Sequence, residues 1–363
     1  EKMFLKIQEA VALLNREYLQ SFSVSKETRT HDIQKICCFI EQVCEEQHTV
    51  FVHGRGKRKS RNQKYLDLFR RFLERQTVYD GHTASFQGRN NYCKTDPDAT
   101  FMHMKDDHMR NAQLKPGYNV QIGVDSEYIV AADIFQDRND VWTLIPFLET
   151  IEKKVGFRYP SVTADSGYES EEAYTYLREQ KQKPYIKPQT YEKWKKRSFK
   201  QDISKRENMG YDEITDTYIC HAGKELKPLF IKKQKSKSGY ESEVTVYECE
   251  DCTGCPHKEK CTRAKGNKRL YISKSFLEKR QESYENILSE KGILYRMNRS
   301  IQVEGAFGVL KNDYEFQRFL LRGKTKVKLE ILLLCMGYNL NKLHAKIQNE
   351  RTGSHLFPVK ETA

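Results

Sequence analysis

Four cysteines gather between residues 249 and 261 in the pattern C-x2-C-x2-C-x5-C. Gly254 and Pro256 favour tight turns between them. Four thiolates this close together suit a tetrahedral structural Zn²⁺ site, although free thiols and an iron–sulfur cluster are the alternatives. We predict zinc, with Cys220, His221 and His257 as spare ligands. The predicted ligands are Cys249, Cys252, Cys255 and Cys261; the other cysteines, Cys37, Cys38, Cys44, Cys93 and Cys335, are interpreted as buried thiols.

Two carboxylates stand where they could hold a harder metal ion. Asp165 ends the short apolar run 159–165 and precedes a glycine, which predicts a carboxylate at the carboxyl edge of a sheet, where ligands bind in α/β folds. The same pattern is more often a helix cap. Glu304 lies in a helical segment, 303–311, and Lys311 follows two helical turns later on the same face. The pair could hold a metal ion and a DNA phosphate, whereas a solvated Glu and Lys is the commoner case.

The elements around Asp165 follow a recognisable order. Residues 117–124 and 128–135 alternate apolar and polar side chains around the turn Asp-Ser-Glu, which predicts a β-hairpin. Asp140 then has the character of a helix N-cap for 141–156, because Leu144, Leu148 and Ile151 form a helical stripe. A strand ending at Asp165 and a helix over 166–180 complete the order strand, strand, helix, strand, helix. Two further helices are predicted at 301–321 and 326–348, separated by Gly323.

The start of the chain is helical and basic. Apolar side chains recur at steps of three and four residues in 3–20, 31–47 and 64–79, the last segment following a cation-rich run over 55–64. Lys and Arg number 63 against 50 Asp and Glu, which gives a formal charge of +13 and favours a polyanionic partner. These cations either lie on a solvent-exposed helix face or contact phosphates, and the sequence leaves both interpretations open.

A second basic stretch lies between residues 181 and 212, where Lys and Arg far outnumber the acids and Tyr185, Tyr191, Trp194 and Phe199 are interleaved. Aromatic rings among cations are typical of nucleic-acid contact, although an anchored helix gives the same pattern. We favour DNA contact. The following region, 214–248, is β-rich, with strands predicted at 215–220 and 243–248.

Six blocks in order resemble the DDE transposases of bacterial insertion sequences, over about residues 57 to 346. They are TDPDATFM (95–102), KPGYNVQIGVDSEYIV (115–130), TADSGY (163–168), VEGAFGVLK (303–311), FQRFLLRG (316–323) and GYNLNKL (337–343). The resemblance implies a ribonuclease H-like fold and an Asp, Asp, Glu site that binds two Mg²⁺ ions. It also implies double-stranded DNA partners, namely the terminal inverted repeats and the target DNA, and a homodimer in the active complex.

By this resemblance Asp165 is the second acid, Glu304 the third, and Lys311 matches the family's lysine. The first acid belongs to the first of three antiparallel strands, and only one strand separates Asp125 from the helix at 141. Asp125 therefore falls in a turn, and the first strand lies around 93–104, which leaves Asp96 or Asp98; we choose Asp96. Tyr295 and Arg299 precede the Glu at an unusual spacing. The predicted DNA-binding residues are Lys311, Arg299, Arg318, Arg322, Lys195, Lys196 and Arg197.

The expected architecture is α/β: a ribonuclease H-like mixed sheet flanked by helices, with a β-rich, cysteine-containing insertion and a helical N-terminal region. The expected divisions are a helical basic region at 1–88, the first catalytic part at 89–180, the insertion at 181–285, the C-terminal catalytic helices at 286–350 and a tail at 351–363. Apolar runs are too short to span a bilayer and no signal peptide is evident, so we expect a cytoplasmic, DNA-associated protein. The rival functions are a non-catalytic DNA-binding protein and a nuclease of the same fold.

Overall fold

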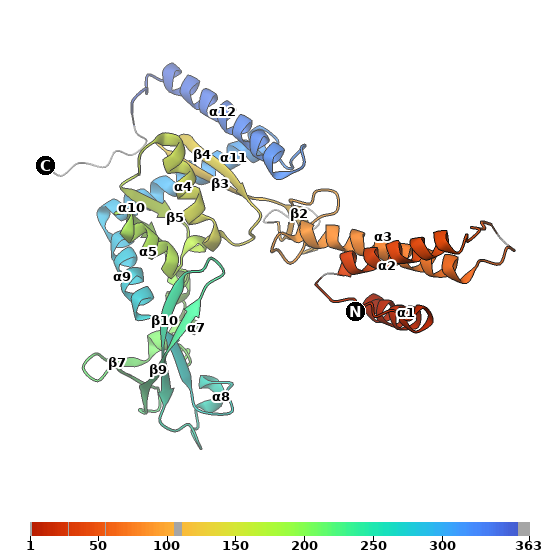
Figure 1. The fold of residues 1–363 in the computed structure, drawn as a ribbon. Helices are drawn as coiled ribbons and strands as arrows, with labels where there is room; N and C mark the ends of the chain where they lie inside the picture. Colours follow the sequence, from red (N-terminus) through yellow and green to blue (C-terminus); the bar gives the residue numbers. More distant parts are fainter. Residues whose placement is uncertain (1, 28, 55, 105–110, 355–363) are drawn as a thin grey trace. The chain divides into compact units, whose positions relative to one another are not determined.

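The computed structural model describes residues 2–27, 29–54, 56–104 and 111–354 (Figure 1). The chain divides into two compact units, Glu1–Pro97 and Asp98–Ala363, which are described separately. Arg55 in the basic run and residues 355–363 of the predicted tail lie outside the described residues. The finer five-part division stays a prediction.

The first unit is built from the three predicted helices, α1 (Lys2–Tyr18), α2 (Arg29–Glu46) and α3 (Arg61–Phe86). Their apolar stripes form one core, since Ile7, Leu14, Ile33 and Phe69 are all fully buried. The Ser60 hydroxyl caps α3 by accepting a hydrogen bond from the Gln63 N–H. The stripe pattern therefore predicted these helices correctly, whereas Cys38 on α2 is exposed instead of buried.

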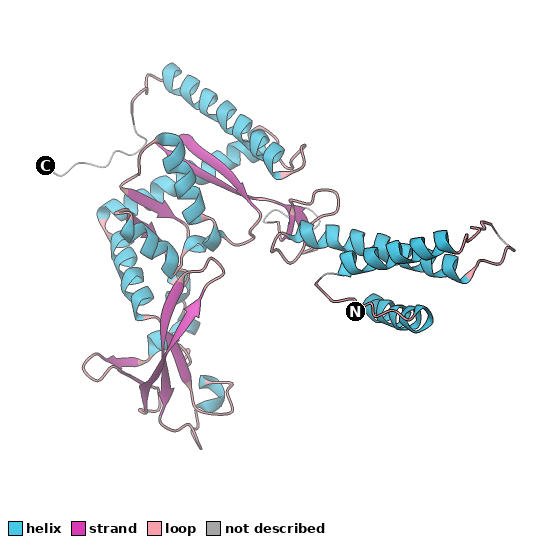
Figure 2. Ribbon diagram, in the orientation of Figure 1, coloured by secondary structure: helices cyan, strands magenta, loops and turns pink. Residues whose placement is uncertain are grey.

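The second unit begins with small sheets covered by helices, and Figure 2 shows the mixture of strands and helices. Strands β3 (Asn119–Asp125) and β4 (Tyr128–Phe135) form the predicted antiparallel hairpin, and positive φ angles at Ser126 and Glu127 close its turn. Helix α4 (Leu144–Val155) packs Phe147 and Ile151 against β4. Strand β5 (Ser161–Ala164) pairs in parallel with β6 (Lys183–Ile186) through the crossover helix α5 (Glu171–Glu179).

Two predictions about this region need correction. Asp140 is not a helix N-cap: it opens the 3₁₀ turn Asp140–Trp142, and the side chain of Asn139 caps that turn. The strand predicted around 93–104 shrinks to β1 (Thr100–Met102), which pairs with β2 (Lys115–Gly117) instead of joining β3 and β4. Within the described residues the architecture is thus mixed α/β, and a continuous ribonuclease H-like sheet stays a prediction.

A five-stranded antiparallel sheet is formed by the middle part of the second unit's sequence, residues 210–272. Its strand order is β11-β10-β9-β8-β7, from β7 (Gly210–Asp212), β8 (Thr217–Ile219), β9 (Glu225–Lys235), β10 (Glu241–Cys249) and β11 (Arg269–Ile272). The 3₁₀ turn Arg206–Asn208 leads into it. The turn joining β9 to β10 reaches α5, where Ser238 donates a hydrogen bond to Glu172 and the Tyr240 hydroxyl bonds Thr175. These bonds tie the sheet to the elements that follow Asp165.

One long helical segment carries Glu304. Helix α9 (Lys274–Leu288) is followed by α10 (Glu290–Arg299), which continues through π-helical turns at Ser300–Glu304 and Val309–Asp313 on either side of α11 (Gly305–Gly308). The segment ends at Asp313, and residues 314–323 form a loop. The helix predicted to reach residue 321 is therefore shorter than expected. Isolated π turns inside α-helices occur often at functional sites.

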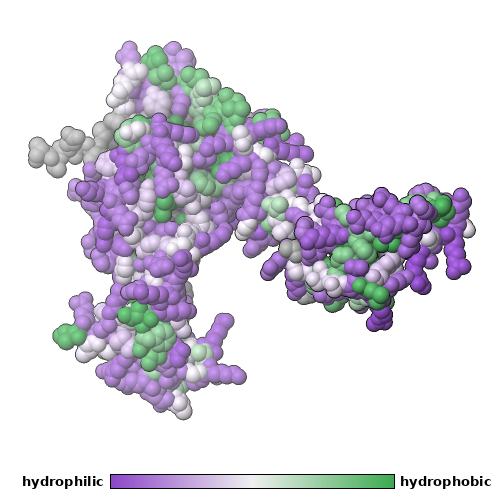
Figure 3. Space-filling view, viewed as in Figure 1, coloured by the Kyte–Doolittle hydropathy of each residue, from purple (hydrophilic) through white to green (hydrophobic). Residues whose placement is uncertain are grey.

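The last helix, α12 (Lys324–Gln348), lies along β4. The Lys324 N–H at its start donates a 2.8 Å hydrogen bond to Asp98 Oδ2. The Asn339 amide bonds both the N–H and the C=O of Ile129, and thereby fixes the helix to the strand. The outward face carries an apolar row, visible along α12 in Figure 3 and formed by Leu329, Leu333, Met336, Leu340, Leu343 and Ile347.

Candidate active site

Asp165 directly follows β5, as predicted, and opens the 3₁₀ turn Ser166–Tyr168 (η2). One carboxylate oxygen, Oδ1, accepts a 2.7 Å hydrogen bond from the Ser166 N–H, while more than half of the side chain is exposed. The carboxylate therefore has two roles available: its Oδ1 caps the turn, and Oδ2 is left for a cation.

A buried ion pair holds the turn after Asp165. Glu169 is buried and the Arg280 side chain of α9 is only 11% exposed, with 2.8 Å between Glu169 Oε1 and Arg280 Nε. The Gln189 N–H and the Tyr174 hydroxyl also donate to this carboxylate. Burial raises the pKa of Glu169, an effect that these hydrogen bonds and Arg280 oppose. The turn is thus fixed to α9 on one side and to α5 on the other.

Glu304 and Asp165 both contact the side chain of Arg299. Arg299, at the end of α10, places Nη2 3.7 Å from Asp165 Oδ2 and Nη1 3.8 Å from Glu304 Oε1. The guanidinium is mostly buried, whereas both carboxylates are largely exposed. The first π turn brings Glu304 to this position. Two acids that lie far apart in the sequence therefore share one cationic partner.

A third carboxylate, Asp140, lies in the same neighbourhood, although its sequence context predicts only a helix cap. Asp140 Oδ1 accepts hydrogen bonds from the amides of Asn119 (2.7 Å) and Gln121 (3.1 Å) on β3. Gln121 in turn accepts a hydrogen bond from the Tyr168 hydroxyl. Burial raises the pKa of Tyr168, Asp140 and Asp165 add to the rise, and Arg299 opposes it.

The absence of a side chain at Gly167 leaves room for the Asp140 carboxylate. A Cβ on Gly167 would lie 3.1 Å from Asp140 Oδ2, so a side chain at that position would crowd the carboxylate. One sequence signal could have found this group: Asn119 and Gln121 place two amides on the same face of a strand whose neighbouring side chains, Val120, Ile122 and Val124, are apolar, and unpaired polar groups are costly in such a strand. Such amides need a partner, and Asp140 is that partner.

The other predicted acids have separate positions. Asp96 belongs to the first compact unit, Glu1–Pro97, and its place in the site stays a prediction. Asp98 accepts a hydrogen bond from the Lys324 N–H. Asp125 ends β3 at the hairpin turn, as predicted. Among the described residues, no group of three or more His, Cys, Asp or Glu side chains stands assembled around a metal position.

The carboxylates nevertheless suit a divalent cation. Asp165 and Glu304 supply hard oxygen ligands of the kind that Mg²⁺ prefers, and both are exposed enough to be reached. Their shared contact with Arg299 shows that positive charge is favoured between them.

The predicted DNA-binding cations are exposed, whereas the aromatic side chains near them are packed. Lys195, Lys196 and Arg197 lie on the surface around the short helices α6 (Tyr191–Trp194) and α7 (Arg197–Lys200). Trp194 packs edge-to-face on Tyr284 of α9, and Arg280 lies over its ring. The aromatic side chains therefore anchor this segment, which leaves contact with DNA to its cations. Lys311, Arg318 and Arg322 are exposed after Glu304.

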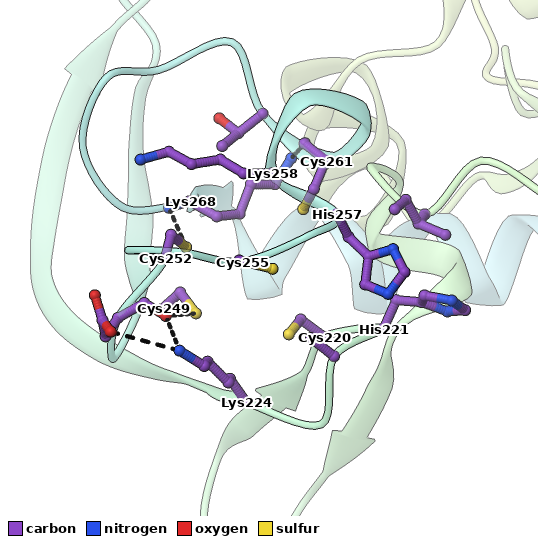
Figure 4. A pocket seen from close by; sticks show the side chains of 14 residues that line it. Cys220, His221, Lys224, Cys249, Cys252, Cys255, His257, Lys258, Cys261 and Lys268 are labelled. Carbon is purple, nitrogen blue, oxygen red and sulfur yellow. Dashed lines mark hydrogen bonds and ion pairs between the residues drawn. The ribbon is translucent and has the colours of Figure 1, made fainter.

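The predicted cysteine ligands lie together beside the five-stranded sheet (Figure 4). All four line one small cavity, and so do Cys220, His221 and His257. Cys261 belongs to the short helix α8 (Lys258–Cys261). Burial raises the pKa of its thiol; Lys268 opposes this rise, and Cys220, Cys252 and Cys255 add to it. The cluster is thus larger than the C-x2-C-x2-C-x5-C pattern.

Comparison with known families identifies the C-terminal region. Residues 219–344, roughly a third of the chain, match the family model described as "Transposase DDE domain". This part of the chain is similar to a transposase DDE domain. The resemblance drawn from the sequence blocks is thereby confirmed, and the family supports a transposase-type function with a DNA partner. No curated protein and no solved structure matches the chain.

The match covers only part of the candidate site. Arg299, Glu304, Lys311 and the cysteine cluster lie within the matched residues, whereas Asp96 and Asp165 precede them. None of the helices in the described part of the chain combines the length and apolar character required to cross a membrane.

Proposed function

We propose that this transposase cleaves DNA at insertion-sequence ends and joins the freed ends to target DNA, with Asp165 and Glu304 as ligands of divalent metal. The observation that carries the proposal is the convergence of both carboxylates on Arg299. The family resemblance adds Asp96 as the first acid, a ribonuclease H-like arrangement of the catalytic elements and a homodimer in the active complex.

The chemistry requires oxygen ligands around the reacting phosphate. Bound Mg²⁺ would stabilise the entering and leaving oxygens of an in-line displacement. Asp165 and Glu304 would hold it through oxygens that are already exposed, while Arg299 orients the two carboxylates and balances their charge. The Ser166 N–H bond keeps Asp165 Oδ1 fixed, so Oδ2 is the oxygen that faces the cation.

The charge of the protein supports DNA as the substrate. A formal charge of +13 favours association with a polyanion and makes its affinity fall as salt rises. Lys311, Arg318 and Arg322 follow Glu304 on an exposed segment and would contact phosphates near the cut. Lys195, Lys196 and Arg197 would add backbone contacts without reading the base sequence.

The proposal is tested with the wild-type chain and duplexes that carry the element's ends. We expect nicking when Mg²⁺ is present, and binding without nicking when EDTA removes it. Pre-cut ends should then be joined to a target plasmid. Binding with no nicking at any Mg²⁺ concentration would favour a non-catalytic DNA-binding protein. Nicking without joining of pre-cut ends would favour a nuclease of the same fold.

The first acid is tested by a matched pair of substitutions. We expect Asp96→Asn to abolish Mg²⁺-dependent nicking and Asp140→Asn to reduce it by about 10- to 100-fold, the usual cost of disturbing groups that support ligands. Nicking is measured at saturating DNA with both variants folded by circular dichroism. The opposite ranking, with Asp140→Asn inactive and Asp96→Asn active, would make Asp140 the first acid.

A further inference from the structure

The cysteine cavity has features that the proposed DNA chemistry does not use. It lies beside the five-stranded sheet and is lined by cysteines from two separate segments of the chain. Cys220 follows β8 in the tight turn 220–224. The Cys220 N–H donates a hydrogen bond to the Lys224 carbonyl, and the Cys220 carbonyl accepts one from the Gly223 N–H. Cys249 is the last residue of β10, and the remaining cysteines come from the segment between β10 and β11. Figure 4 shows the labelled cysteine side chains directed toward one another.

The size of the cavity restricts what it can hold. The space open to the centre of a water-sized sphere is about 20 Å³. One water molecule needs about 10–15 Å³ on this measure, so the cavity suits a single ion. An organic ligand would need a larger cavity.

We propose that this cavity is a structural Zn²⁺ site whose ligands are Cys220, Cys252, Cys255 and Cys261. All four side chains line the same cavity, and Figure 4 shows them directed toward its interior. Zn²⁺ takes four thiolates in tetrahedral geometry with Zn–S distances of about 2.3 Å. In the described residues the four sulfurs line one cavity without being assembled around a metal position, so the ion would have to draw them together from its walls.

This ligand set differs from the sequence prediction at one position, since Cys220 takes the place of Cys249. Cys249 is the last residue of β10, where its backbone is paired with Leu226. Its side chain also lines the cavity, but it is buried more deeply in the apolar core of the sheet than Cys252, at 3% exposed against 7%. Cys220 is only half-buried and lies in a turn outside the strands, so its thiol can turn toward an ion without disturbing the ladder.

The surroundings suit the charge of such a site. Zn²⁺ with four thiolates carries a net charge of about −2. Three lysines line the cavity: Lys224, Lys258 and Lys268. The Lys268 N–H also donates to Cys252 Sγ at 3.4 Å, the type of backbone bond that stabilises a metal-bound thiolate. His221 and His257 face each other with ring centroids 4.9 Å apart, and we assign them no ligand role.

The site links two segments of the sheet that are otherwise joined mainly by strand pairing. Cys220 belongs to the β8–β9 turn, whereas the three other ligands follow β10. A shared ion would cross-link them much as a disulfide closes a loop, and it would favour folding because the unfolded chain holds no preformed site. The inference does not depend on the proposed DNA chemistry.

Metal content tests the proposal directly. The full chain, purified under reducing conditions and without added metal, should hold one zinc per chain by inductively coupled plasma mass spectrometry. Exchange with Co²⁺ should give the intense visible bands of a tetrahedral thiolate site. A chain without zinc that also fails to bind Co²⁺, or one that contains iron, would overturn the proposal.

Two single substitutions then test the ligand set. Cys220→Ser should lose the zinc, whereas Cys249→Ser should retain it; retention by Cys220→Ser together with loss by Cys249→Ser would overturn the assignment. His257→Ala, a change at the cavity wall outside the ligand set, should keep full occupancy. If Cys220→Ser fails to fold, the Co²⁺ spectrum of Cys249→Ser decides, because four-thiolate bands must persist without Cys249.

Discussion

Asp165→Asn and Glu304→Gln are each expected to lower Mg²⁺-dependent nicking by more than about 100-fold while DNA binding is retained. Disturbing groups that merely support metal ligands already costs about 10- to 100-fold, so removing a ligand's charge should cost more. Asn at position 165 is chosen because its amide oxygen can still accept the Ser166 N–H and keep the cap. The substitution therefore separates a metal ligand from a residue that only starts a turn.

The matched control for this pair lies on the same helical segment. Asp313 ends the second π turn and is exposed. It is not one of the two acids, Asp165 and Glu304, that contact Arg299. Asp313→Asn should leave nicking unchanged. Gel-shift titration and single-turnover nicking are measured on all three variants. If Asp165→Asn nicks DNA at the wild-type rate, Asp165 is a cap alone; if Glu304→Gln does so, Glu304 is a surface residue.

Arg280→Met is expected to destabilise the second unit by about 3–5 kcal/mol, because it leaves the buried Glu169 carboxylate without its cation. The comparison is Arg178→Met on α5, whose contacts with Glu278 and Glu282 are exposed. That change should cost no more than about 1 kcal/mol. Urea unfolding followed by tryptophan fluorescence reports both variants, since Trp194 lies beside Arg280.

The pH dependence identifies the cause of this loss. Burial already raises the pKa of Glu169, and removing Arg280 should raise it further. A carboxyl whose pKa is higher in the folded protein favours folding at low pH, and that contribution is lost as pH rises through the folded pKa. The deficit of Arg280→Met should therefore be smaller near pH 5 than near pH 8. A deficit that is equal at both values would point to lost packing instead.

Helices with a clear apolar stripe could be predicted from the sequence, and some strands could not. The stripe of α1 buries Ile7 and Leu14 as expected, because burial of one face decides where a helix lies. Strand β9 was missed: nearly all of its side chains are exposed, so no alternation marks it, and it exists through its ladder with β10. The π turns were also missed, since an apolar stripe fits an α-helix equally well.

Part of the candidate site could also be predicted from the sequence. Asp165 at a strand end and Glu304 in a helix follow from local pattern, whereas their common contact with Arg299 depends on how α10 packs near β5. Asp140 was misread because a carboxylate before a helix is ordinarily a cap, and its real partners, Asn119 and Gln121, lie on a distant strand. Tertiary contacts of this kind leave little trace in one sequence.

The π turn at Ser300–Glu304 makes the helical segment unusually tolerant of a change in length. Deleting one residue there would convert the wide turn to an ordinary α-helical one, and the helix would stay intact. Residues beyond the deletion would keep nearly the same face of the helix, because the five residues of the π turn span about the same angle as four α-helical residues placed about 100° apart. Such a shortened chain should therefore fold and still carry its glutamate one turn beyond Arg299.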